Sequence, residues 1–184
     1  MYYISLDDVT SVQMGLAVTK RPEFPAPVKN YKEYSIPGRN GKLYEYMGTY
    51  EDIQFEIEMN YISSEYQWGI KWHEVKRWLF KSGHKRLSFS DCPDIYYRIK
   101  RIELSSNERR VIESGEFTVT VTCDVYAYLK TGLKEYDIED ILLNRHDEAE
   151  PVYILKGEGT CILNVNGNEC KCLSLIHISE PTRH

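Results

Sequence analysis

A strict alternation of apolar and polar side chains in residues 53–59 constrains the fold more than any other feature of this sequence. The apolar positions are Ile53, Phe55, Ile57 and Met59, and polar residues fill the positions between them. Successive side chains of a β-strand point to opposite faces. This period of two therefore predicts a strand with one buried face and one solvated face.

A tight turn precedes this strand. Gly38 and Gly41 bracket Arg39 and Asn40, and glycine and asparagine tolerate positive φ at a hairpin tip. Residues 34–59 therefore predict a strand, a tight turn and a second long alternating strand. This hairpin carries no catalytic motif.

Further strand-like segments, separated by turn-forming residues, run through most of the chain. They span residues 2–5, 16–20, 29–36, 42–47, 53–62, 86–90, 96–104 and 116–127. The turns expected between them cover residues 22–27, 38–41, 91–94 and 105–108.

One helix interrupts the strands. Ser64 and Gln67 have the spacing of a capping box and Gly83 suits a left-handed stop, so we expect a single long helix near residues 64–81. Its buried face is expected to carry Trp68, Trp72, Val75 and Leu79, with Trp78 beside it. One helix among many antiparallel strands predicts a mainly β fold for residues 1–129: a β-sandwich with one α-helix, of α+β character.

The pattern changes after position 129. Residues 130–144 are expected to be a connection, and residues 151–156 and 160–165 two strands of a second β domain. Residues 166–168, Asn-Gly-Asn, predict a hairpin tip. Two or three strands cannot bury a core alone, so residues 130–172 are interpreted as a linker and the truncated start of that domain.

Composition is typical of a folded, strand-rich protein. The chain has 184 residues, fifteen tyrosines and a formal net charge of −5, with acidic and basic residues interspersed. This charge pattern gives no footprint for nucleic acid. No apolar run reaches the length of a membrane span, and the first residues lack a basic region before an apolar core, so neither a membrane anchor nor a signal peptide is expected.

Five scattered cysteines are explained most simply by free thiols in a reducing compartment. They are Cys92, Cys123, Cys161, Cys170 and Cys172. A zinc site at the last three is disfavoured, because C-x-C is not the usual structural zinc spacing and no histidine follows at the expected interval. No metal or cofactor is expected.

Asp91 and Asp94 are the candidates for acid–base chemistry, because paired carboxylates can hydrolyse glycosides. Aspartate beside proline is also typical of a turn, and the strands on both sides favour the turn. The His73-Glu74 pair lacks the second histidine of a metalloprotease helix, since position 77 is arginine.

The remaining histidines and sequence motifs do not indicate a catalytic or metal-binding site either. His84 and His146 have no ligand partner at metal spacing, and the chain contains neither a phosphate loop nor a Gly-x-Ser-x-Gly elbow. We therefore predict no catalytic residue and no enzyme.

A basic strand end and loop is formed by Arg98, Lys100, Arg101, Arg109 and Arg110. Two interpretations stay open for these residues. They are a solvated edge that discourages strand pairing, or they contact an acidic neighbouring subunit.

Several segments, taken in order, resemble phage distal tail proteins, which join the tail tube of long-tailed phages to the tip. The matching pieces are the turn at 37–41 with its following strand, the tryptophan helix at 68–80, the strand and aspartate-rich turn at 85–97, the closing strand at 115–126 and the segment at 144–157. Val125 departs from the pattern, because the position before Tyr126 is often proline in that family. The resemblance covers most of residues 1–172.

The resemblance implies a virion structural protein of a phage or prophage, made in the bacterial host cytoplasm. Residues 1–129 would form a ring, hexameric in that family, with the tail-tube protein on one face and the tail-tip protein or baseplate on the other. The second domain would be galectin-like and would project outward. The competing interpretation is a carbohydrate-binding module for host-surface attachment, in which surface tyrosines stack on sugars.

Residues 173–184 are expected to be non-native. Residues 173–183 match, residue for residue, a conceptual translation of a sequencing adapter, so we expect a truncated reading frame whose natural sequence continues past Cys172. We therefore leave these residues out of the predicted fold, as one would leave out residues that remain from cloning.

Overall fold

The computed structural model describes residues 2–64, 66–81, 83–108, 113–137, 151–156, 160–172 and 177–179. These residues belong to two compact units, Met1–Glu135 and Tyr136–His184. The first unit contains one α-helix and two sheets, and the second contains four short strands.

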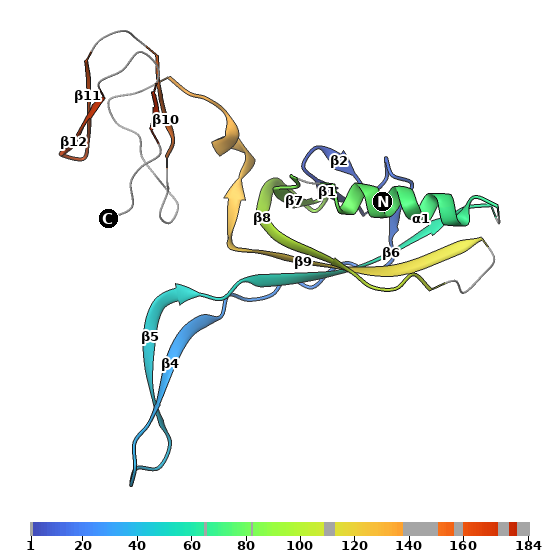
Figure 1. Cartoon of the computed structure of the whole chain (residues 1–184), viewed down its shortest axis with the longest axis horizontal. Helices are drawn as coiled ribbons and strands as arrows, with labels where there is room; N and C mark the ends of the chain where they lie inside the picture. The colour runs from blue at the N-terminus through green and yellow to red at the C-terminus, as the bar shows by residue number, and fades with distance from the viewer. Residues whose placement is uncertain are drawn as a thin grey trace. The chain divides into compact units, whose positions relative to one another are not determined.

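A seven-stranded antiparallel sheet dominates the first unit, with the strand order β2-β1-β7-β8-β9-β6-β3 (Figure 1). Its strands are β1 Ile4–Leu6, β2 Val9–Thr10, β3 Ala17–Val18, β6 Ile53–Ile62, β7 Arg86–Phe89, β8 Cys92–Leu104 and β9 Ser114–Leu129. Register shifts on both sides of β8 mark bulges, and bulges bend a sheet. The mainly β fold with one helix is confirmed, and the curled sheet is consistent with the predicted sandwich-like arrangement.

The pairing of β6 with β9 forms the centre of the core. It runs without a break from Ile53 opposite Cys123 to Ile62 opposite Ser114. The alternation predicted for residues 53–59 is confirmed, because Ile53, Phe55, Ile57 and Met59 are at most 6% exposed and the polar residues between them are exposed. The same alternation buries β9 through Phe117, Val119, Val121 and Cys123.

Helix α1, Trp68–Leu79, lies along one face of this sheet (Figure 1). Val75, Trp78 and Leu79 are buried, whereas Trp68 and Trp72 are partly buried against the same core. The Trp72 ring lies 5.1 Å from the Phe117 ring, centroid to centroid. Burial of such apolar area, rather than helix propensity, supplies most of the stability of a helix of this length.

The expected start and end of this helix, and its capping box, are wrong. Gln67 is the N-cap and makes no side-chain cap hydrogen bond, while its backbone N–H donates to the Ser64 carbonyl over 3.0 Å. The chain is still tied to the sheet at Ser63, whose N–H donates to the Glu113 carbonyl, so the helix begins only at Trp68. Gly83, beyond the helix, adopts the expected positive φ, +106°.

The turn expected at residues 91–94 is also shorter than predicted. Cys92 pairs with Phe89 across the turn, so Ser90 and Asp91 make the connection and Asp94 lies inside β8. A two-residue connection satisfies the geometry of an antiparallel hairpin, and proline is tolerated near the start of a strand.

A proline-rich segment, residues 19–28, flanks β6 beyond the two residues of β3. The Thr19 N–H donates to the Glu58 carbonyl at one end, and Val28 accepts from the Glu51 N–H at the other. The three prolines of this segment have no backbone N–H that could donate a hydrogen bond. The segment therefore shields this side of β6 while offering few groups for edge-to-edge pairing.

His84 connects the end of α1 to the β1–β2 turn. Its Nε2 lies 2.5 Å from the Trp78 carbonyl oxygen and its Nδ1 lies 3.0 Å from the Asp7 carboxylate. The tautomer of the imidazole decides which of the two ring nitrogens donates. Partial burial opposes ionisation of Asp7, but the hydrogen bonds from His84 and from the Lys85 and Arg86 N–H groups outweigh it and lower the pKa of Asp7.

The hairpin turn predicted at residues 38–41 joins β4 Lys29–Ser35 to β5 Lys42–Tyr50 in a separate two-stranded sheet, the ribbon (Figure 1). The second long strand expected up to Met59 is divided, because β5 ends at Tyr50 and β6 belongs to the main sheet. Gly38 and Gly41 adopt φ values of +81° and +83°, as expected at its tip. The ribbon hydrogen-bonds to no other strand in the described part of the chain.

The first unit ends with a short 3-10 helix, η1 Lys130–Leu133, inside the segment expected to be a connection. The second unit pairs β11 Cys161–Val165 with β12 Asn168–Cys172, and β10 Tyr153–Leu155 with β13 His177–Ser179. Asn166 and Gly167 both have positive φ, which confirms the predicted hairpin tip. The rest of the connection, residues 138–144, lies outside the described residues, as do residues 145–150 and the tail apart from β13.

Candidate assembly surface

Four tyrosines form a continuous surface on one face of the ribbon. Because Tyr31 pairs with Tyr46 and Glu33 pairs with Tyr44, these side chains share a face. Ring centroids are separated by 6.4 Å between Tyr31 and Tyr44, 5.7 Å between Tyr31 and Tyr46, and 6.4 Å between Tyr46 and Tyr50. We call Tyr31, Tyr44, Tyr46 and Tyr50 the tyrosine face.

A positively charged side chain of the ribbon lies against the tyrosine face. The Lys29 ammonium lies 5.2 Å from the centroid of the Tyr46 ring, a cation–π geometry. The pKa of Tyr46 is raised chiefly by lost hydration. The hydrogen bond with Tyr50 and the charge of Tyr50 raise it further. The charge of Tyr126 in β9 also contributes to this shift.

The tyrosine face is exposed. Tyr44 is 57% exposed, Tyr31 50% and Tyr46 43%, and Leu43 and Met47 of the same ribbon are also exposed. A two-stranded ribbon is marginally stable in water, and a contiguous exposed apolar surface is typical of an interaction site. The ribbon is therefore a candidate interaction surface.

The geometry of the rings is a poor match to sugar stacking. The interplanar angles of the three tyrosine pairs are 87°, 51° and 69°, so the rings present edges at differing tilts. Such edge-to-face contacts are favourable between aromatic rings, but they provide no flat platform for a pyranose.

A second exposed apolar group lies where β6 continues into α1. Ile62 is 80% exposed, Tyr66 92% and Ile70 62%. Ile62 belongs to the solvated face of β6, whereas α1 covers the opposite, buried face, so these side chains are exposed separately.

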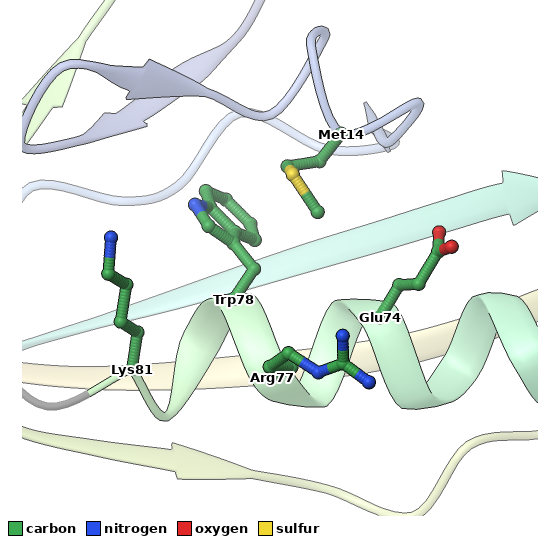
Figure 2. A pocket seen from close by; sticks show the side chains of 5 residues that line it. All are labelled: Met14, Glu74, Arg77, Trp78 and Lys81. Carbon is green, nitrogen blue, oxygen red and sulfur yellow. The ribbon is translucent and has the colours of Figure 1, made fainter.

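A shallow pocket of about 450 Å³ opens between α1 and the turn that precedes β3. Figure 2 shows that Met14 and Trp78 provide its apolar part, with Glu74, Arg77 and Lys81 around it. Glu74 is paired with Lys71 over 3.3 Å, which neutralises the carboxylate.

The aspartates considered for acid–base chemistry occupy structural positions. Asp91 belongs to the β7–β8 turn and Asp94 to the exposed start of β8. His73 is exposed on α1, whereas His84 is used by the contact with Asp7. His146 lies outside the described residues.

The basic strand end makes contacts within the chain. The Lys100 ammonium lies 2.5 Å from Asp52, and this hydrogen bond raises the pKa of Lys100. Arg101 pairs with Glu103, and the Arg98 guanidinium lies 4.1 Å from the centroid of the Tyr128 ring. Arg109 and Arg110 lie outside the described residues, and neither interpretation of this cluster is tested.

Cys92, Cys123, Cys161 and Cys170 are free thiols, and Cys123 is buried in β9. Among the residues that the structure describes, no group of three or more histidine, cysteine, aspartate or glutamate side chains is placed to hold a metal ion. None of the described helices has the length and apolar character needed to cross a membrane.

The sequence did not single out the tyrosine face. The period-two spacing of Tyr44 and Tyr46 was a usable signal, because it puts both on one face of a strand. Their alignment with Tyr31 depends on the register of the ribbon, which includes a bulge between Lys29 and Tyr31.

Comparison with solved structures finds this fold in a protein of the phage adsorption apparatus. The match is the crystal structure of the SPP1 Dit (gp 19.1) protein, described as a paradigm of the hub adsorption apparatus in phages that infect Gram-positive bacteria. The TM-score is 0.54 at 12% identity, over 67% of this chain and 49% of that chain. This chain thus matches about half the length of the SPP1 protein, and the likeness at this identity concerns the fold.

The expected resemblance to a phage distal tail protein is confirmed at that level. Comparisons with protein-family models and with curated protein sequences find no match.

Proposed function

We propose that this chain is a structural component of a phage tail: a distal tail protein whose first unit assembles into a closed ring between the tail tube and the tail tip or baseplate. The exposed ribbon with its tyrosine face is the observation that carries this proposal. A monomer leaves this surface uncovered, and a neighbouring subunit would cover it.

The fold and the ordered sequence motifs support the same role. The SPP1 protein that shares the fold is described as a paradigm of the hub adsorption apparatus, and a protein that repeats around an axis forms a closed ring. In this role identical copies contact one another head to tail, and rotation that closes produces a ring with two unlike faces. One face would bind the tail-tube protein and the other the tail-tip protein, within the virion.

The smaller unit has a separate part in this proposal. Residues 130–172 are the linker and the truncated start of a second β domain that would project outward and carry host-binding parts, and residues 173–184 contribute nothing native. Ring formation then depends on the first unit alone.

The mass of the assembled protein tests the proposal. Light scattering on the full chain over a range of concentrations is expected to show a monomer converting into one larger species, hexameric in the resembling family. Negative-stain images of that species should show closed rings with a central opening. A chain that stays monomeric at every concentration, including after addition of a tail-tube protein from the same phage, contradicts the proposed role.

A further inference from the structure

We propose that Cys161 and Cys172 are a modification site of the second unit, where oxidation joins them in a disulfide across the β11–β12 hairpin. The register of this hairpin places the two residues directly opposite each other, at the end of the strands away from the turn. The bond itself follows from this register, and only the time at which it forms rests on the proposed function.

The spacing of opposite residues in an antiparallel pair suits a disulfide. Directly opposite Cα atoms lie about 4.5–5.5 Å apart, depending on whether the pair exchanges hydrogen bonds. A disulfide needs a Cα separation of roughly 4.4–6.8 Å, so the bond can close without movement of either strand. The two-residue tip at Asn166 and Gly167 fixes the register, because loop length and turn type determine the pairing of a hairpin.

Cys170 is the competing partner, and the same register disfavours it. Cys170 lies opposite Leu163, so it is diagonal to Cys161. Diagonal neighbours of an antiparallel pair lie roughly 7–8 Å apart, beyond the reach of a disulfide. Cys170 and Cys172 share the extended strand β12, where residues two positions apart lie about 6.6 Å apart and their Cα–Cβ bonds do not converge.

The hairpin has few other interactions that could stabilise it. β11 and β12 form a two-stranded sheet that hydrogen-bonds to no other strand in the described part of the chain. Among the side chains that the structure describes in this hairpin, none is buried. Two strands without a core are marginally stable, whereas a covalent link between them constrains the unfolded chain and so favours the folded hairpin.

The bond forms by exchange with a small disulfide such as oxidised glutathione. The thiolate of Cys161 attacks one glutathione sulfur, which forms a mixed disulfide and releases one glutathione thiolate. The thiolate of Cys172 then attacks the Cys161 sulfur and releases the second glutathione. The two protons lost by the cysteines end on the two glutathione thiolates, and oxidised glutathione takes up the two electrons. Cys161 is exposed, so the oxidant reaches it.

The time of oxidation follows from the compartment. Thiols in the cytosol are kept reduced, and Cys161 is a free thiol in this structure. If the chain belongs to a virion, as proposed above, the bond forms only after the particle leaves the host and meets an oxidising medium. The second unit would then be assembled with free thiols and cross-linked later.

Peptide mapping of the full chain after treatment with oxidised glutathione tests the bond. Trypsin releases residues 157–171, which contain Cys161 and Cys170, apart from the peptide that begins at Cys172. A glutamyl endopeptidase then cuts after Glu169 and separates the first two cysteines. After acid quenching and alkylation, the Cys161 and Cys172 peptides should be found joined, about 2 Da lighter than their summed reduced masses.

Serine variants of the three cysteines provide matched controls. Thiol titration in denaturant should fall from five to three in the unmodified chain, and from four to two in C170S. C161S and C172S should keep all four of their thiols under the same treatment. A non-reducing gel should show the oxidised chain at the mass of one chain, because the bond lies within a single hairpin.

The outcomes separate this inference from the proposed function. Five remaining thiols, a stable mixed disulfide with glutathione, or a bond that involves Cys170 overturns the inference, whatever the oligomeric state. A chain that forms the bond but never assembles into a ring supports the inference and contradicts the proposed function. A bond already complete in acid-quenched host cells shows the pairing to be right and the proposed time of oxidation to be wrong.

Discussion

Replacing Gly115 with alanine should destabilise the first unit through a single steric conflict. Gly115 lies in β9 directly opposite Tyr61 in β6, and the Tyr61 ring folds over it. A Cβ at position 115 would lie 2.4 Å from Cζ, 2.5 Å from Cε1 and 2.7 Å from the hydroxyl oxygen of Tyr61. Ring and backbone cannot both keep their places at such distances.

The Tyr61 ring has little freedom to move away. Tyr61 is 1% exposed, and its hydroxyl accepts from the Asn107 side-chain amide over 2.8 Å. Overpacking a core typically costs about 1–3 kcal/mol, and loss of the hydroxyl contact adds about 1 kcal/mol. Removing a glycine from a strand returns about 0.5–1 kcal/mol. We therefore expect G115A to lower the free energy of unfolding by about 2–3 kcal/mol.

Thermal unfolding followed by tryptophan fluorescence measures this effect. All three tryptophans lie in α1, so their emission reports on the first unit. At about 4 °C per kcal/mol for a unit of this size, the midpoint should fall by roughly 8–12 °C. The matched control is G69A, because Gly69 is exposed in α1 with open space around it, and this change should stabilise by up to about 1 kcal/mol.

A double-mutant cycle isolates the cause. In a Y61L background the alanine at position 115 no longer meets a ring, so adding G115A should cost nothing further. If G115A is neutral in the original chain, or costs the same with and without the Tyr61 ring, the steric explanation is wrong.

Three further outcomes are expected. The lowered pKa of Asp7 means that its contacts stabilise the fold above an ordinary carboxyl pKa of about 3.9 and lose that effect as the pH falls through the lowered value. The stability difference between the unmodified chain and D7N should therefore be constant near neutral pH and vanish in acid, in denaturant titrations at a series of pH values. Burial, and then the charges of Asp124 and Asp52, raise the pKa of Cys123 to about 12, so a thiol reagent should label Cys92 in the folded chain and reach Cys123 only on unfolding. Deleting residues 173–184 should leave the tryptophan-monitored midpoint unchanged, and a clear drop would mean that the tail is a real structural element.

The sequence predicted the structure best where a local residue pattern has a single physical explanation. In β6 the period of two identified a half-buried strand because its glutamates cannot share a face with Phe55 and Ile57 without losing hydration. The glycines at 38 and 41 likewise required positive φ, and the structure has it. These features follow from local chemistry and need no knowledge of distant contacts.

The sequence was less informative where distant contacts decide. The start of α1 depends on Ser63 being held by Glu113, fifty positions later in the chain, which no capping pattern reveals. The two-residue strands β2 and β3 lack any periodicity, because two positions cannot define a period. The tyrosine face depends on the register that places Tyr31 opposite Tyr46. A bulge beyond Tyr31 then places Tyr50 opposite Lys29, and bulges leave only weak marks in sequence.

The position of β9 has a consequence for the order of events during synthesis. β9 pairs with both β6 and β8, so the main sheet cannot close until Leu129 has left the ribosome, 67 residues after the end of β6. At about 5–20 residues per second, that interval lasts roughly 3–13 s. The tyrosines of the ribbon are translated before it begins, so they are exposed on a nascent chain that has no folded core. Neighbouring ribosomes on one messenger would then bring several such ribbons close together, and premature pairing between them would compete with correct folding.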